Sequence, residues 1–244
     1  MTKRRTDVQS WEGKSLRAHV LYSRAGVAQH IWIENQNGAV LVDAGDGLIR
    51  DLISNDLDPG RIRGVVFTHG HFDHVGGLYS LLGFLRMMGR KKLLPIIAPR
   101  GCEEVFSLVE SFENCYPDTI PFEIRRREVR SEQVIRIAGM SIKAYEVVHC
   151  GSIEGAEILD RIPAVGYRIS HQGETIAVSG DTGFCPSLER LAKGANLAIV
   201  EASYKKSRGL DREVLKKVHL SEELAQKVGR LAKNFLLVHR GEGQ

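Results

Sequence analysis

The sequence has few of the features that mark secreted, disulfide-bonded or membrane-spanning chains. Its 244 residues include only four cysteines, and no two of them form a C-x-x-C pair. We therefore expect free thiols in a reducing compartment rather than a disulfide framework. No apolar run approaches the ~18 residues that cross a bilayer, and no apolar signal-peptide segment follows the basic N-terminus. These absences predict a cytoplasmic protein without a membrane segment.

Linkers and repeats are absent as well. No Pro/Gly/Ser-rich linker, low-complexity tract or short-period repeat divides the chain. Hydrophobic residues make up 43%, enough to bury a substantial core without disulfides. We therefore predict a single domain over residues 1–244. The net charge of +4 and the pI near 8.9 permit an anionic substrate without requiring one.

The first half of the chain alternates between strand and helix patterns. Runs of β-branched and aromatic residues predict strands at 16–21, 29–34, 39–44, 62–68 and 93–98. The turn "QNG" joins the second and third of these as a hairpin. Apolar residues at helical spacing predict helices at 48–57, 77–89 and 101–112.

The second half repeats this arrangement. Strands are predicted at 122–128, 132–138, 141–149, 164–170, 174–180, 196–202 and 234–240, and helices at 188–194 and 221–233. We interpret the order as two αβ halves that meet near residue 125. Each half then contributes one sheet, the sheets pack face to face, and the helices lie outside.

The segment "THGHFDH" (68–74) concentrates metal-binding side chains at the end of a predicted buried strand. His69, His71, Asp73 and His74 fall within six positions, where the chain turns from strand into helix. Such a turn lies at a sheet edge, where clefts form and side chains can converge. Imidazole and carboxylate donors favour Zn²⁺, although Mn²⁺ and Fe²⁺ accept the same donors. Four donors this close can serve two ions, if other segments supply further ligands.

With these residues the chain resembles the metallo-β-lactamase superfamily, whose fold is a four-layer αββα sandwich. It is most similar to the branch that contains ribonuclease Z and related phosphodiesterases. The resemblance extends from about residue 29 to 240 and includes the segments "PAVGYRIS", "AVSGDTG", "HLSEELA" and "LLVHR". The resemblance implies a dinuclear hydrolase with two divalent ions.

The resemblance also implies a role for each donor. His69, His71 and His149 would hold one ion, and Asp73, His74 and His239 the other, with Asp181 bridging the two. Three further members of this set stand at or next to the ends of predicted strands: His149, Asp181 and His239. Strand ends that meet at one edge would bring these groups together.

Two more residues take roles from the resemblance. Asp43, at the end of the strand "AVLVD", would accept an N–H from a ligand imidazole and fix its tautomer; a turn aspartate before glycine is the alternative. His219 stands just before a predicted helix and would donate a proton to a phosphoryl or leaving-group oxygen. A surface histidine beside the N-cap Ser221 is the alternative there. Asp73 would also orient or deprotonate the nucleophile.

The predicted reaction is hydrolysis, since two divalent ions can activate water and polarise a phosphoryl or carbonyl oxygen. The branch resemblance, His219 and basic clusters at 89–92, 125–127 and 204–217 favour a phosphodiester. Each cluster could equally be a solvated face. A thioester, lactone or β-lactam hydrolase remains the alternative. A flavodiiron reductase is excluded because it has Glu where His71 stands, and an inactive binding module because every ligand position is filled.

One departure from the branch limits the substrate. Its tRNA-processing members carry a long arm, which grips tRNA, between the positions of His149 and Asp181. Here only 31 residues separate these two positions. A small-molecule or single-stranded nucleic-acid phosphodiester is therefore favoured over folded tRNA. Relatives are commonly dimeric, so the resemblance also allows a homodimer.

Overall fold

The structure is a computed structural model, and it describes residues 8–152, 158–206 and 212–241. A seven-stranded sheet occupies the first half of the chain, and its strands stand in sequence order. The strands are β1 (Gln9–Glu12), β2 (Arg17–Arg24), β3 (Ala28–Asn35), β4 (Gly38–Val42), β5 (Ile62–Val66), β6 (Leu94–Pro99) and β7 (Ile124–Val129). From β1 to β4 the pairing is antiparallel, and from β4 to β7 it is parallel.

A six-stranded sheet follows, in the order β15-β14-β13-β12-β9-β8. Its strands are β8 (Val134–Ile137), β9 (Met140–Glu146), β12 (Val165–His171), β13 (Glu174–Val178), β14 (Leu197–Glu201) and β15 (Asn234–Val238). The last three pair in parallel and the others are antiparallel. Two short strands, β10 (Cys150–Ser152) and β11 (Ile158–Arg161), pair with each other as a separate two-stranded sheet.

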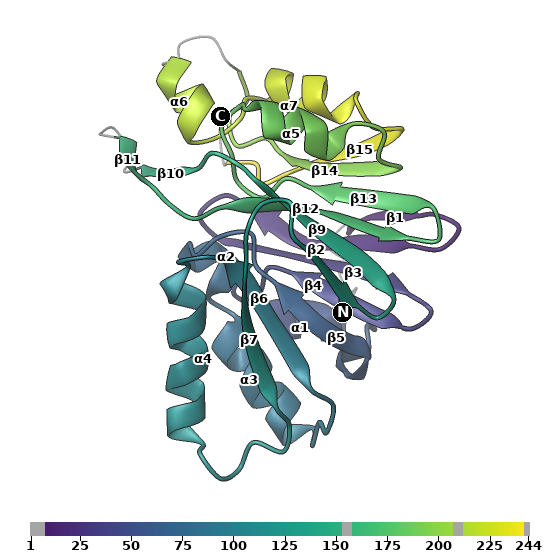
Figure 1. Ribbon diagram of the computed structural model, residues 1–244, viewed down its shortest axis with the longest axis vertical. Helices are drawn as coiled ribbons and strands as arrows, with labels where there is room; N and C mark the ends of the chain where they lie inside the picture. Colours follow the sequence, from purple (N-terminus) through teal and green to yellow (C-terminus); the bar gives the residue numbers. More distant parts are fainter. Residues whose placement is uncertain (1–7, 153–157, 207–211, 242–244) are drawn as a thin grey trace, which may run out of the picture.

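The two sheets pack face to face, with helices on both outer faces (Figure 1). The first sheet is covered by α1 (Leu48–Ser54), α3 (Leu78–Met87) and α4 (Glu103–Cys115), and the second by α5 (Pro186–Ala192) and α7 (Glu222–Gly229). Short helices α2 (Phe72–Val75) and α6 (Arg212–Lys217) and the 3₁₀ turn η1 (Pro59–Arg61) complete the chain. This is the predicted four-layer αββα sandwich.

The strand sequences explain the layers. In β3, Ile31 and Ile33 point into the core between the sheets, whereas Trp32 points toward the helices, and all three are fully buried. In β14, Ile199 faces the inter-sheet core and Val200 faces α5 and α7. Successive side chains of a strand point to opposite faces, so a strand covered on both faces is apolar throughout. Each such side chain stabilises the fold by about 1.5–3 kcal/mol on burial.

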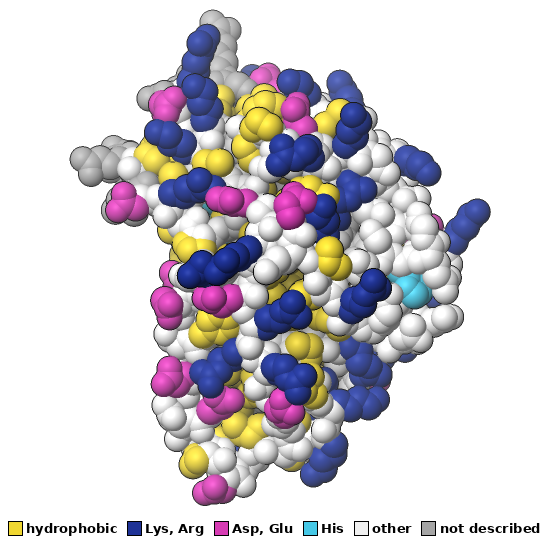
Figure 2. Space-filling view, viewed as in Figure 1, with side chains coloured by type: hydrophobic (Ala, Val, Ile, Leu, Met, Phe, Trp, Pro, Cys, Tyr) yellow, Lys and Arg dark blue, Asp and Glu magenta, His cyan; other side chains and the backbone are white. Residues whose placement is uncertain are grey.

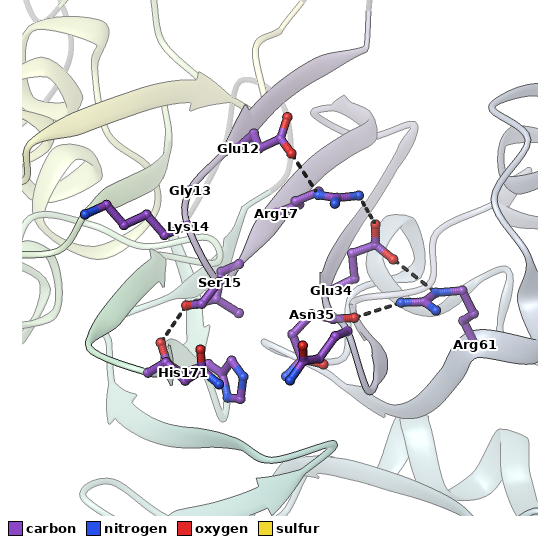
Figure 3. A pocket seen from close by; sticks show the side chains of 12 residues that line it. Glu12, Gly13, Lys14, Ser15, Arg17, Glu34, Asn35, Arg61 and His171 are labelled. Atoms are coloured by element: carbon purple, nitrogen blue, oxygen red, sulfur yellow. Dashed lines mark hydrogen bonds and ion pairs between the residues drawn. The ribbon is translucent and has the colours of Figure 1, made fainter.

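The end of the sandwich opposite the predicted donors is closed by Glu174, at the start of β13. Its carboxylate accepts hydrogen bonds from the backbone N–H groups of Lys14, Ser15 and Leu16, at 2.6–3.1 Å. Burial raises the pKa of Glu174, but these donors outweigh it and lower the pKa below its usual value. A 250 Å³ pocket lies beside this contact, where Arg17 bridges two glutamates (Figure 3).

Most predicted elements are confirmed, but the division between the halves near residue 125 was wrong. The strand predicted at 122–128 is β7, which pairs in parallel with β6 and so belongs to the first sheet. The helix α4 connects the end of β6 to the beginning of β7, so the two strands run in the same direction. The chain crosses to the second sheet only after Val129. β1, β10, β11 and α6 were not predicted. Within the described residues, no helix is long and apolar enough to cross a membrane.

Candidate metal centre

Six strand ends meet at one edge of the sandwich, and each carries a polar side chain at its end or within three residues after it. His69 follows β5, His149 follows β9, Asp181 follows β13 and His239 follows β15. Asp43 follows β4, and Glu201 is the last residue of β14. Parallel strands of both sheets direct their carboxyl ends here, so residues far apart in sequence become neighbours. His71, Asp73 and His74 reach the same edge from the turn into α2.

The seven predicted ligands converge. Three overlapping groups each place their donor atoms within 4.8 Å of one another: His69, His71 and His149; His69, His74 and Asp181; and Asp73, His74 and His239. All of these side chains except His71, which is half-buried, are buried. Asp181 Oδ2 lies 3.4 Å from both His74 Nε2 and His239 Nε2, and 3.9 Å from His69 Nε2. Asp181 is thus central to the cluster, as a bridging carboxylate would be.

Asp43 fixes the orientation of two of the imidazoles. Its Oδ2 accepts the Nδ1–H of His74 at 2.8 Å. The Thr68 hydroxyl donates to the same carboxylate at 2.9 Å, so its oxygen is left to accept the Nδ1–H of His69 at 3.1 Å. Both histidines therefore carry their proton on Nδ1 and turn Nε2 toward the cluster. The expected role of Asp43 matches this geometry.

Two further imidazoles are held in the same tautomer. His149 Nδ1–H donates to the carbonyl oxygen of Val218 at 2.8 Å. Ser203 donates its hydroxyl proton to Glu201 at 2.8 Å and accepts the Nδ1–H of His239 at 3.1 Å. Metal-binding histidines are typically held in this way through the ring nitrogen that does not touch the metal.

The donor atoms fit a pair of cations. Three buried atoms in the cluster have no hydrogen-bond partner: His69 Nε2, His74 Nε2 and Asp181 Oδ1. Leaving such atoms buried and unpaired costs about 1–3 kcal/mol each, unless a ligand satisfies them. Burial lowers the pKa of His69 and of His71, and lowers that of His149 to about 3, so these rings stay neutral as metal binding requires. A dinuclear site accounts for all three unpaired atoms.

His74 differs in charge from its neighbours. Burial lowers its pKa, but the carboxylates of Asp181 and Asp43 outweigh burial and raise it well above the usual value. The pKa of Asp181 is in turn lowered, because the charges of His239 and His74 offset the effect of burial. A cation that binds His74 Nε2 must therefore displace a proton.

Glu201 was not assigned a role from the sequence, although it too ends a predicted strand. Its fully buried carboxylate accepts His219 Nδ1–H and the backbone N–H of Leu220 and Thr182, at 3.0–3.1 Å. Burial lowers the pKa of His219, but Glu201 outweighs it and raises that pKa to about 9. Its position near the end of a predicted strand was the signal in the sequence that could have identified Glu201, because His149 and Asp181 stand at comparable positions.

Asp73 is one of the residues that line a cavity above the donor cluster. Asp73 Oδ2 accepts the N–H of Gly26 at 2.9 Å and lies 3.2 Å from His239 Nε2. A 240 Å³ cavity above the donors is bordered by Ala25, Gly26, His71, Phe72, Asp73, His149, Cys150, Gly151, Asp181, His219 and His239. Phe72, which the sequence did not single out, is 68% exposed at this rim. Cys150 lines the same cavity.

The three basic clusters do not line the cavity in the described part of the chain. In the 89–92 cluster, the Arg90 guanidinium donates to the carbonyl oxygens of Ile62, Lys92 and Leu93 and so serves the fold. The 125–127 cluster lies on the exposed edge strand β7, where charged side chains discourage pairing with another sheet. The 204–217 cluster falls partly outside the described residues. The first two clusters therefore match the alternative of a solvated face and give no support for a phosphodiester substrate.

Comparison with known proteins agrees with this architecture. A family model described as the beta-lactamase superfamily domain matches residues 39–239. The chain belongs to this superfamily. This member is 29% identical over 245 residues to a protein named Ribonuclease Z from Ignicoccus hospitalis, an alignment that covers 85% of this chain and 80% of the relative.

Solved structures show the same fold. The metallo-β-lactamase fold protein YhfI from Bacillus subtilis has a TM-score of 0.74 at 17% identity, over 95% of this chain and 88% of YhfI. The short form of human tRNase Z also has a TM-score of 0.74, at 20% identity, over 92% of this chain and 93% of that structure. The family, the relatives and the donor cluster together support a metal-dependent hydrolase of phosphodiester bonds, and none of these comparisons favours an acyl-ester hydrolase.

Proposed function

We propose that this superfamily member hydrolyses phosphodiester bonds in single-stranded nucleic acid or in smaller phosphodiesters, with two divalent ions. The observation that carries the proposal is the convergence of seven donors from both sheets, with four imidazoles locked so that Nε2 faces the cluster. We propose that His69, His71 and His149 hold one ion and Asp73, His74 and His239 the other, with Asp181 shared. Because both sheets contribute, we propose that residues 1–244 act as one hydrolase unit.

Zn²⁺ is the ion that this donor set suits best, since it combines imidazole and carboxylate without thiolate. When bound, two such ions polarise the phosphoryl oxygens and lower the pKa of a water, so that it can attack at neutral pH. The residues around them then determine orientation and proton transfer.

Asp73 is the proposed acceptor of the nucleophile's proton. The Gly26 N–H donates to its Oδ2 and holds the carboxylate in the lining of the cavity. Burial raises the pKa of Asp73, but His239 and His74 outweigh it and lower the pKa, so the carboxylate is ionised at neutral pH. An ionised carboxylate can orient a water and accept its proton.

His219 is the proposed donor to the leaving oxygen. It borders the cavity, and its pKa of about 9 keeps it protonated at neutral pH. Glu201 holds Nδ1, which leaves Nε2–H free to donate a proton to the departing alkoxide. Glu201 acts through His219, so its role is positioning.

The proposed substrate follows from the similarity to ribonuclease Z and from the short segment that stands where tRNA-processing relatives carry a tRNA-gripping arm. The named relatives are ribonuclease Z enzymes, and the short form of human tRNase Z shares the fold. Between His149 and the core strand β12, the described residues form only the short pair β10 and β11. A phosphodiester that needs no long gripping arm, such as single-stranded RNA, suits this opening best.

The test uses purified chain loaded with Zn²⁺ or Mn²⁺ and offered a bis-aryl phosphate, a thioester and a lactone side by side. We expect turnover of the phosphate, its loss in His69→Ala, and its retention in His171→Ala, which alters a histidine at the far end of the sandwich. Turnover of the acyl substrates alone would overturn the proposal.

Two expectations accompany the proposal. A cytoplasmic location is consistent with the four cysteines, none of which forms a disulfide. A homodimer rests on the resemblance alone, and light scattering of the purified chain would test it.

A further inference from the structure

A second cavity opens beside the metal centre, and the proposed reaction does not use it. It measures 520 Å³, within the size range of small-ligand sites. Apolar side chains, including those of Pro99, Pro163 and Val165, form part of its lining. The charged residues of the lining are three exposed arginines and one glutamate: Arg100, Arg130, Arg161 and Glu146. We call this the arginine cavity.

The arginine cavity shares its wall with the metal centre. Its residues 162–164 connect β11 to β12, which begins at Val165. The Ile162 N–H donates to the carbonyl oxygen of His149 at 3.0 Å, and the Val165 N–H donates to that of Thr68 at 2.9 Å. Both acceptors belong to the loops that carry metal donors. A substrate held at the donors therefore has the arginine cavity as its neighbour.

Two of the three arginines are uncommitted. Arg161 pairs with Glu146 at 2.6 Å and donates to the carbonyl oxygen of Val147. Within the described residues, the guanidinium groups of Arg100 and Arg130 make no hydrogen bond or ion pair. Arg100 is held through its backbone, whose N–H donates to the carbonyl oxygen of Val129 at 3.0 Å. Their donor groups are therefore available to an anion, which Arg binds in a bidentate manner.

The position of these arginines matters more than the total charge. Lys and Arg side chains are spread over the face that carries β6, β7 and β9, with Asp and Glu among them (Figure 2). A few guanidinium groups beside the cleaved bond can bind a phosphate of the substrate without a large basic patch. Apolar side chains beside anion-binding guanidinium groups suit one nucleotide, whose base has a flat face and whose phosphate is charged.

We propose that the arginine cavity binds the nucleotide unit next to the phosphodiester that is cleaved, with its phosphate at Arg100 and Arg130. This assignment rests on the proposed function and names its substrate as a nucleic-acid strand rather than an isolated small phosphodiester. It also gives the centre a means of holding a strand without a long arm.

The test separates binding from hydrolysis. Anisotropy of a labelled eight-nucleotide single-stranded RNA is measured with the full chain in chelator, so that no cleavage occurs. The variant is Arg100→Gln/Arg130→Gln, and the control is Arg136→Gln, an exposed arginine on β8 away from the cavity. We expect the double variant to bind about tenfold more weakly or worse, and the slope of log affinity against log salt concentration to fall by about 0.7, the value for one phosphate contact on a single strand. Arg136→Gln should change affinity less than about twofold.

Metal-loaded protein provides the second measurement. The double variant should hydrolyse a bis-aryl phosphate as the unaltered chain does, because that substrate has no second phosphate for Arg100 and Arg130 to bind. Its kcat/KM for the RNA should fall about tenfold or more, a difference of ~1.4 kcal/mol. Equal losses on both substrates would indicate a structural effect and overturn the assignment.

The outcomes distinguish the two proposals. If no phosphodiester is cleaved but RNA binding still depends on Arg100 and Arg130, the proposed function fails and the binding subsite stands. If the unaltered chain cleaves RNA and the double variant binds and cleaves it equally well, only the subsite fails. An acidic peptide that displaces the RNA at similar concentration would show a general anion site and contradict the nucleotide assignment.

Discussion

Asp43→Asn removes the carboxylate that orients two proposed metal ligands while leaving the backbone able to keep its shape. Asp43 has φ 64°, a left-handed conformation that asparagine also adopts readily. Two carboxylate oxygens now receive four donors: the Thr68 N–H, the Thr68 hydroxyl, His74 Nδ1–H and, at 3.4 Å, the Gln29 side-chain amide. An amide offers only one oxygen, so its NH₂ group must face one of these donors.

The effect on metal binding follows from the tautomer. Facing an NH₂ group, His74 would take its proton on Nε2 and lose the lone pair that a cation needs. The Thr68 hydroxyl, which connects Asp43 to His69, would also lose its acceptor. Residues that orient metal ligands typically contribute 10–100-fold to metal affinity, which is about 1.4–2.7 kcal/mol. We expect the upper part of this range, because two ligands depend on one carboxylate.

Competition with a chromophoric chelator for Zn²⁺ at neutral pH measures this change. The control is Asp46→Asn, which removes the same charge from an exposed position three residues away. Thermal unfolding of both variants shows whether the fold survives. Wild-type Zn²⁺ affinity in folded Asp43→Asn would refute the reasoning that Asp43 fixes the tautomers.

Three further perturbations test other parts of the site and the fold. Asp73→Ala should lower kcat about 10²–10⁴-fold in a chain that still unfolds cooperatively, and a near-normal rate would remove Asp73 from its role. Glu201→Gln should move the alkaline limb of the kcat/KM profile to lower pH, because Glu201 raises the pKa of His219 to about 9; an unmoved limb would contradict this. Glu174→Gln should lower the free energy of unfolding by about 1–3 kcal/mol at neutral pH. Since the folded pKa of Glu174 is lowered, this difference is present above the ordinary pKa of about 4.3 and shrinks as the pH falls through the folded value. Denaturant titrations of both proteins, at neutral pH and at a pH below the folded pKa of Glu174, measure this difference in stability. A pH-independent difference would contradict the assignment.

The features predicted from sequence were those with a local signature. Strands such as β3 and β14 are apolar throughout because both faces are covered, and their composition alone reveals them. "THGHFDH" carries four donors within one turn. His149, Asp181 and His239 were added from the family resemblance, and each also stands at the end of a strand pattern. The resemblance then proposed which donor serves which ion.

What sequence could not supply depends on contacts between distant segments. Glu201 reaches His219 across 18 positions, and Ser203 reaches His239 across 36. No periodicity connects such pairs, because the sheet register brings them together. The sheet to which β7 belongs was missed for the same reason: its pairing with β6 depends on the path of α4. The arginine cavity likewise joins Arg100, Arg130 and Arg161 from three separate segments of the chain.

The metal content of the purified chain tests the central claim most directly. Elemental analysis after dialysis against Zn²⁺-containing and then metal-free buffer should give about two ions per chain. The Asp181→Ala variant should retain fewer, because this carboxylate lies between the two donor groups. A folded chain with no stoichiometric metal, or with the same content in both proteins, would contradict a dinuclear centre built on these seven side chains.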